Sequence, residues 1–134
     1  RKKSWSLNRF INIAKKISRN GKQPVFFIEK KNTKLINNIK KEINNAMFPE
    51  QESSLFGPPL ITALATRLDK AISIDNGIMH MIGLANIPMI VLFGPTDSQK
   101  FAPKIENIDI LDSKLIYNSN DILRIKEEDV LKFI

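Results

Sequence analysis

The sequence contains no cysteine, a single histidine and few aromatic residues: eight phenylalanines, one tryptophan and one tyrosine. Without cysteine the chain can form no disulfide, carry out no thiolate chemistry and build no cysteine-type zinc site. One histidine without a dense cluster of carboxylates argues against a metal site built by the protein, so we expect no metal and no cofactor. The few aromatic residues are not interleaved with basic ones, so the sequence shows no RNA-binding signature.

Long apolar runs are also absent. No stretch approaches the roughly 20 residues that a membrane-spanning helix needs, and no uninterrupted apolar segment follows the basic N-terminus as it would in a secretory signal. The 134 residues correspond to about one domain, given the usual size of roughly 100–200 residues. We therefore expect a single domain.

Basic residues are in excess, with a formal net charge of +7. Much of this excess lies early, in residues 1–3, in Lys15-Lys16 and between Lys30 and Lys41. A charge of this sign indicates an anionic partner, which could be nucleic acid, a phosphorylated ligand or an acidic membrane surface. It is also typical of solvated helix faces, which is the interpretation that charge pattern alone favours, so charge does not identify the partner.

Apolar periodicity predicts alternating helices and strands. Helices are expected over residues 7–17, 32–45, 60–68, 78–85 and 126–134, and buried strands over 24–28, 70–74, 88–93 and 108–111, with a loop at 48–59. Strands that alternate with helices over short connections predict an α/β fold, a Rossmann-like parallel sheet flanked by helices. Such a sheet normally begins with a strand, whereas this sequence opens on basic residues that lead into a helix. We therefore expect the first strand to be missing from these residues.

A polar break, Asp75-Asn76-Gly77, separates the predicted strand 70–74 from the helix that follows it. In open parallel sheets, ligands bind where the carboxyl ends of strands meet helix N-termini. Free backbone N–H groups and the helix dipole suit an anion there, and a glycine lets the backbone approach it closely. The alternative is that Asp75 or Asn76 simply caps the helix beside a turn glycine.

The next strand ends in a similar way. Gly94, Pro95 and Thr96 follow Phe93 directly, and Asp97 comes next. These residues either line the same crevice as the first break or form an ordinary proline-containing turn. The only histidine, His80, lies one turn into the helix after the first break, where it either contributes to a site or is hydrogen-bonded to a neighbouring loop.

The segment "DNGIMHMIGLANIPMIVLFGPTDSQKFAP", residues 75–103, resembles the donor-binding segment of family 9 glycosyltransferases, the lipopolysaccharide heptosyltransferases. The matching positions are Asp75, Gly77, Met79, His80, Pro88, Phe93, Gly94, Pro95, Thr96 and Pro103. Lys3 and Trp5 are similar to the family's Lys-x-Trp motif, and "RIKEEDVLKFI" is similar to its closing helix. The resemblance covers nearly the whole chain.

The sequence departs from the family pattern at several places. Asn76 stands for the usual serine and Ile78 for the usual proline. The Gly-Gly and acidic residue that normally follow the family's second strand are replaced by "FFIEKKNT". Glu29 of this segment would be a displaced substitute for the acidic residue. We expect the family's N-terminal acceptor domain, which carries the carboxylate assigned as general base, to lie outside these residues.

The resemblance implies the C-terminal half of a GT-B glycosyltransferase. In that architecture two Rossmann-like domains hold a nucleotide-sugar in the cleft between them, and residues 1–134 would be the single donor-binding domain. The implied reaction is an inverting, metal-independent transfer, with ADP-heptose as the expected donor and a lipopolysaccharide-core-type acceptor. The lipid-linked acceptor would bind through the missing N-terminal domain, so we expect these residues to be inactive alone. No nucleic-acid partner is implied, and the bacterial enzyme would be cytoplasmic, with possible peripheral association with an anionic inner membrane.

The resemblance also implies roles for individual residues. Lys3, the backbone amides from Asn76 to Met79 and the helix dipole would stabilise the leaving diphosphate, and Gly94 and Thr96 would complete its crevice. Asp75 would contact sugar hydroxyls, because its carboxylate would repel phosphate. His80 would brace the loop or reach a phosphate oxygen, as a possible catalytic residue. The implied donor-binding residues are Lys3, Asp75, Asn76, Gly77, Ile78, Met79, His80, Gly94 and Thr96.

Two other functions fit the sequence. The domain could bind a nucleotide-sugar without catalysing transfer. Alternatively, it could be a basic domain that docks on anionic lipid or nucleic acid, which predicts binding with a steep salt dependence.

Overall fold

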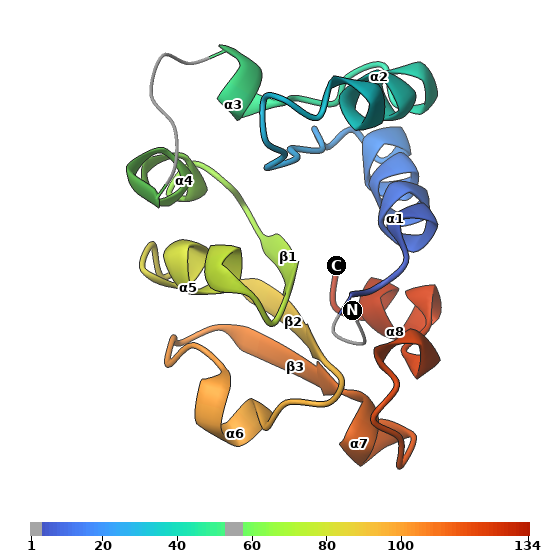
Figure 1. The fold of residues 1–134 in the computed structure, drawn as a ribbon, viewed down its shortest axis with the longest axis vertical. Coiled ribbons are helices and arrows are strands. Elements are labelled where there is room, and N and C mark those ends of the chain that lie inside the picture. The colour runs from blue at the N-terminus through green and yellow to red at the C-terminus, as the bar shows by residue number, and fades with distance from the viewer. Residues whose placement is uncertain (1–3, 53–57) are drawn as a thin grey trace.

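The structure is a computed structural model that describes residues 4–52 and 58–134. Its elements, in chain order (Figure 1), are α1 (Leu7–Arg19), α2 (Thr33–Glu42), α3 (Pro49–Glu52), α4 (Pro58–Ala65), β1 (Ala71–Ile74), α5 (Gly77–Gly83), β2 (Met89–Phe93), α6 (Ser98–Phe101), β3 (Ile108–Asp112), α7 (Ser113–Ile116), the 3-10 helix η1 (Ile122–Arg124) and α8 (Glu127–Leu131).

The three strands form one parallel sheet in the order β1-β2-β3. Ile74 at the end of β1 is in register with Leu92, and Phe93 at the end of β2 is in register with Asp112. The carboxyl ends of all three strands therefore lie at the same edge of the sheet. The expected parallel α/β sheet is confirmed.

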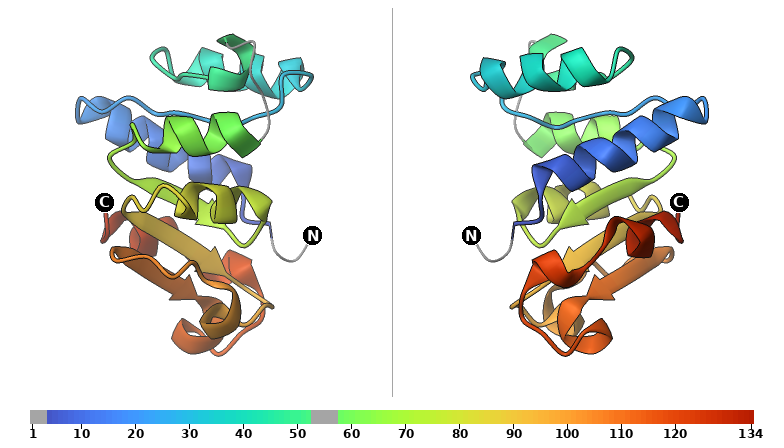
Figure 2. Two further views of the ribbon diagram at one scale, coloured as in Figure 1. Left: turned by 90° about the vertical axis from the view of Figure 1, so that its left-hand side faces the viewer. Right: turned by 90° about the vertical axis from the view of Figure 1, so that its right-hand side faces the viewer.

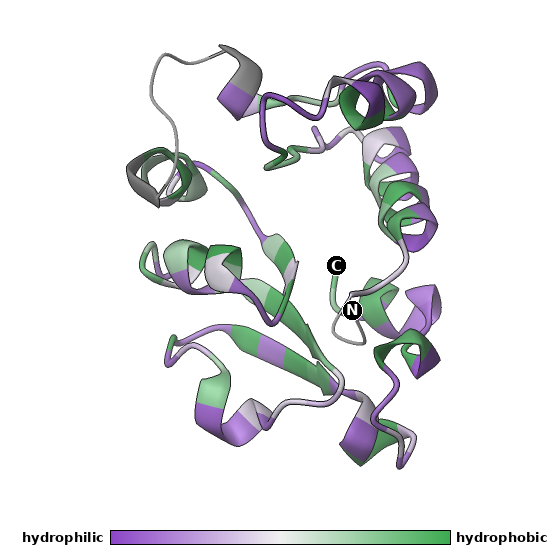
Figure 3. Cartoon of the chain, viewed as in Figure 1, coloured by the Kyte–Doolittle hydropathy of each residue, from purple (hydrophilic) through white to green (hydrophobic). Residues whose placement is uncertain are grey.

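The central strand β2 is buried on both faces, as its uninterrupted apolar sequence predicts. Met89, Val91 and Phe93 join a cluster with α4 and α5, whereas Ile90 and Leu92 join a second cluster with α1 and α8. Two views from opposite sides show these helix groups covering the two faces (Figure 2). Apolar positions concentrate along β1 and β2 (Figure 3).

Helix α1 is tied to the C-terminal part of the chain. The indole Nε1 of Trp5 donates to the carbonyl oxygen of Ile125 at 2.9 Å, and Arg9 Nη1 donates to the same oxygen at 2.8 Å. Trp5 is 5% exposed and contacts Phe10 edge-on. Trp5 is therefore a packing residue, and the first helix and the last form one layer.

The predicted strand at residues 24–28 is wrong. That segment is extended but makes a single parallel bridge, between Val25 and Met47, outside the three-stranded sheet. Phe26 and Ile28 instead pack against a third apolar cluster built around α1 and α2, which includes Ile36. The run is apolar because it covers these helices, and one bridge gives it too little pairing to form a strand.

The other predicted helices and strands are present, with shifted ends. The helix expected over 32–45 ends at Glu42, and the helix of 60–68 already begins at Pro58. Three short helices after β2 were not expected: α6, α7 and η1. Each begins at an aspartate whose side chain accepts a backbone N–H of the first turn: Asp97, Asp112 and Asp121. The predicted loop at 48–59 contains α3, and its residues 53–57 lie outside the described part of the chain.

Several basic residues of the first two helices face solvent. Lys16, Arg19, Lys34 and Lys41 are exposed, as expected for solvated helix faces. Among residues 4–52 and 58–134, no helix is long and apolar enough to cross a membrane.

Candidate functional site

The two polar breaks that follow β1 and β2 meet in the structure. Asp75 directly follows β1, and Thr96 lies three residues beyond the end of β2. The Thr96 hydroxyl Oγ1 donates to Asp75 Oδ2 at 2.6 Å, and Asp75 is only 9% exposed. The sequence-based expectation that both breaks line one place at the carboxyl edge of the sheet is therefore met by these two side chains.

The first turn of α5 is partly closed by its own cap. Asn76 is the N-cap residue, and its Oδ1 accepts the backbone N–H of Met79 at 3.1 Å. The Met79 side chain is fully buried in the core. The expectation that the Met79 amide faces a ligand is thus corrected, because helix capping already occupies it. The amides of Gly77 and Ile78 belong to the same first turn, where a helix supplies no acceptor of its own.

The two glycines of the expected site have different surroundings. A Cβ added at Gly77 would meet nothing within 4 Å. A Cβ added at Gly94 would lie 2.8 Å from Ile122 Cβ and 3.0 Å from the carbonyl oxygen of Asn120. Gly94 is therefore required by close approach of the 120–122 segment, whereas the space beside Gly77 is open to a ligand.

His80 is exposed on α5. It lies beyond the first turn, and the described residues supply no hydrogen-bond partner for its ring. No contact of the His80 ring with the loop is therefore present among the described residues, and its expected role toward a phosphate stays a prediction. Lys3, the other residue expected to act on the leaving group, lies outside the described residues.

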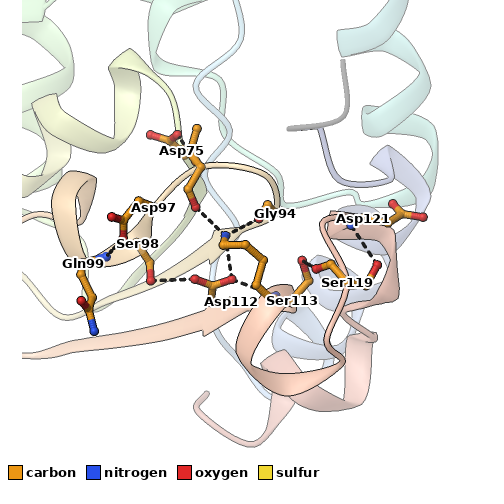
Figure 4. A network of polar contacts seen from close by, with 11 residues as sticks. Asp75, Gly94, Asp97, Ser98, Gln99, Asp112, Ser113, Ser119 and Asp121 are labelled. Carbon is orange, nitrogen blue, oxygen red and sulfur yellow. Dashed lines mark hydrogen bonds and ion pairs between the residues drawn. The ribbon is translucent and has the colours of Figure 1, made fainter.

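A lysine that sequence reasoning missed holds the loop after β2. Lys114 Nζ donates to the carbonyl oxygens of Gly94 and Thr96, the latter at 2.5 Å, and forms an ion pair with Asp112 Oδ1 at 2.9 Å. Asp112 Oδ2 in turn accepts the Ser98 hydroxyl at 2.7 Å. Figure 4 shows this network between the ends of β2 and β3. A signal was available, since β3 ends at Asp112 and is followed by Ser113 and Lys114, as polar residues follow the other two strands.

Asp112 is 3% exposed, yet it is held as a carboxylate. Burial would raise the pKa of Asp112, but hydrogen bonds from Ser98 and Lys114 outweigh it and hold that pKa below its ordinary value of 3.8. The charge of this carboxylate is therefore part of the folded network.

An open depression of about 450 Å³ lies beside the first turn of α5. Its lining residues come from one segment and from the helix: Phe27, Ile28, Glu29, Lys31, Asn32 and Ile78. The depression thus brings Ile78, an expected donor-binding residue, together with Glu29, the suggested substitute for the family's acidic residue. No group of three or more histidine, aspartate or glutamate side chains able to hold a metal gathers in the part of the chain that the structure describes.

The model of the family described as glycosyltransferase family 9 (heptosyltransferase) matches residues 1–129. The chain belongs to glycosyltransferase family 9. The resemblance seen in the sequence is therefore confirmed. No curated protein matches the sequence of this family 9 chain significantly.

Two solved structures have the fold of this family 9 chain. The glycosyl transferase family 9 from Veillonella parvula DSM 2008 aligns with a TM-score of 0.79 and 20% identity over 98% of this chain. The E. coli ADP-heptose lps heptosyltransferase II aligns with a TM-score of 0.75 and 19% identity over 97% of it. The alignments cover 41% and 40% of those chains, so the family 9 chain spans about two fifths of their length.

We predict that the two glycines respond differently to substitution. Gly94→Ala should lower the free energy of unfolding by about 1–3 kcal/mol, because its methyl group would overlap Ile122. Gly77→Ala is the matched control and should change it by less than about 0.5 kcal/mol. Urea denaturation measures both, and equal stabilities of the two variants would contradict the packing role of Gly94.

We also predict a contribution of Asp112 to stability against acid. Because its folded pKa lies below 3.8, the contribution is present above the unfolded pKa and is lost as pH falls through the folded pKa. Asp112→Asn should therefore be less stable at neutral pH and lose less stability on acidification. Thermal unfolding across acidic pH tests this, with the exposed capping residue Asp121 changed to Asn as control. Parallel pH profiles for Asp112→Asn and the unmodified protein would refute it.

Proposed function

We propose that this family 9 chain is the donor-binding part of a glycosyltransferase, which binds a nucleotide-diphosphate sugar at the carboxyl edge of its sheet. The observation that carries the proposal is the contact between Thr96 and Asp75 at the ends of two adjacent parallel strands, in a chain whose family is described as heptosyltransferase. Ligands of open α/β sheets bind at this edge. The depression beside Ile78 adds room for a nucleoside.

The donor would lie across three neighbouring features. The apolar side chains of Phe27 and Ile28 offer a surface for a nucleobase, and Glu29 offers a carboxylate for ribose hydroxyls. The diphosphate would approach the amides of Gly77 and Ile78, since the space beside Gly77 is open. Asp75 would face the sugar, because a carboxylate accepts hydroxyl hydrogen bonds but repels phosphate.

The proposed reaction is a displacement at the anomeric carbon. An acceptor hydroxyl oxygen forms a bond to that carbon while the bond from the carbon to the diphosphate oxygen breaks, and the configuration inverts. The hydroxyl proton passes to a base of the acceptor-binding part of the enzyme, and the nucleoside diphosphate leaves. Negative charge grows on the leaving group, and Lys3 with the first-turn amides of α5 would stabilise it.

ADP-heptose is the donor we propose, with a lipopolysaccharide-core-type acceptor. The support is the family description and the likeness to a structure named an ADP-heptose lps heptosyltransferase. The enzyme would be cytoplasmic, and the exposed basic residues of α1 and α2 would attract it to the surface of an anionic membrane, where a lipid-linked acceptor lies. Neither a metal ion nor nucleic acid is part of the proposal.

The proposal predicts that Gly77→Val weakens donor binding without unfolding the protein. A side chain at this position would occupy the approach to the amides, so affinity for ADP and ADP-heptose should fall about tenfold or more, with Gly77→Ala intermediate. Calorimetric titration of the full-length protein measures this, beside a transfer assay. Unchanged affinity in Gly77→Val would contradict the proposed site. Binding without transfer by the unmodified protein would indicate a binding module, and no binding of ADP, UDP, GDP or their sugars would refute the function.

A second variant separates sugar contact from phosphate contact. Asp75→Asn keeps the size of the side chain but removes its charge, so the preference for ADP-heptose over ADP should fall about tenfold. The affinity for ADP itself should change little. Undiminished preference for ADP-heptose would count against the sugar contact.

A further inference from the structure

Lys114 has no hydrogen-bond donor left for a ligand. A lysine ammonium carries three N–H donors and no acceptor. In this structure its three partners are the carbonyl oxygens of Gly94 and Thr96 and the carboxylate of Asp112. Its charge is also matched by that carboxylate, whose side chain is 4% exposed. Lys114 therefore binds protein groups rather than a phosphate.

The backbone of Lys114 is itself held in place at the end of β3. Asp112 ends β3 and caps α7 by accepting the backbone N–H of Lys114 at 2.9 Å. Its other oxygen accepts the buried hydroxyl of Ser98. Lys114 is thus anchored at the end of β3, while the two carbonyls that it binds belong to the loop after β2.

Thr96 links this anchor to the candidate donor site. Its carbonyl oxygen accepts from Lys114 at 2.5 Å, and its hydroxyl donates to Asp75 at 2.6 Å. Fixing the carbonyl limits the directions in which the same residue can point its hydroxyl. Contacts from Asp112 through Lys114 and Thr96 to Asp75 therefore connect the three strand ends. Figure 4 shows Asp112, Gly94 and Asp75 close together at this edge of the sheet.

We propose that Lys114 is a positioning residue for the donor sugar, which acts by holding the 94–96 loop so that Thr96 orients the Asp75 carboxylate. The inference rests on the proposed function, because it assigns Asp75 to the sugar. It differs from a charge effect on the diphosphate, since Lys114 is paired with Asp112. Loss of the contacts between Lys114 and the 94–96 loop should impair recognition of the sugar. It should leave the affinity for the plain nucleotide nearly unchanged.

The test uses the full-length protein with ADP and ADP-heptose as probes. Lys114→Met keeps most of the side-chain volume but removes all three donors, so the preference for ADP-heptose over ADP and the kcat/KM for transfer should fall on the order of 10- to 100-fold. Lys104→Met is the matched control, because Lys104 also donates to a main-chain carbonyl, that of Gln99, but on the exposed surface. The control should retain the preference of the unmodified protein.

A double-mutant cycle connects the effect to Thr96. Thr96→Val removes the hydroxyl with little change of shape, and it should reproduce the loss of preference seen in Lys114→Met. Because the two residues act in one chain of contacts, the combined variant should be no worse than the more impaired single variant. Lys114→Met could unfold because Asp112 is left as an unpaired buried charge. In that case the double variant with Asp112→Asn removes the charge, and its preference for ADP-heptose over ADP is measured instead and should show the same loss.

The outcomes separate this inference from the proposed function. If the unmodified protein binds no nucleotide-sugar, the proposed function fails and the role of Lys114 with it. If the unmodified protein prefers ADP-heptose and folded Lys114→Met retains that preference, only the positioning role is overturned. Equal losses of ADP and ADP-heptose affinity, or additive effects of Lys114→Met and Thr96→Val, would also overturn it.

Discussion

Burial of β2 on both faces is the constraint on which the rest of the structure depends. A strand that is covered on both sides is apolar at every position, so the polar residues near it in the chain lie before or after the strand. Parallel pairing with β1 and β3 brings the carboxyl ends of all three strands to one edge. The polar residues that end each strand are therefore gathered by the same packing that forms the core.

These gathered residues serve two purposes that compete with each other. Asn76, Asp97 and Asp112 each cap a short helix by accepting a backbone N–H of its first turn. Every amide used in this way is withdrawn from a possible ligand. The Asn76 cap accepts the amide of Met79 and does not use the amides of Gly77 and Ile78. The open space beside Gly77 lies at the same turn.

The sequence allowed the sheet and the two polar breaks to be predicted because both depend on local pattern. The apolar run of β2 and the motif from Asp75 to Thr96 are continuous in the chain. The failed strand at 24–28 shows the limit of such patterns, since an apolar run does not reveal whether it covers a helix or pairs with a strand. Lys114 was missed for a related reason: although its partner Asp112 is only two residues away, its other two partners are main-chain carbonyl oxygens of a loop about twenty residues earlier. No residue pattern encodes contacts to main-chain atoms.

The buried carboxylates also constrain where an anionic ligand can lie. Asp75 and Asp112 are both buried at this edge of the sheet, although the chain carries a net charge of +7. Asp112 is neutralised by Lys114 at 2.9 Å, so its field at the ligand is small. Asp75 accepts the Thr96 hydroxyl at its Oδ2. A carboxylate accepts hydrogen bonds from hydroxyl groups but repels phosphate, so the proposed donor would place its sugar beside Asp75 and its diphosphate on the side of the Gly77–Ile78 turn.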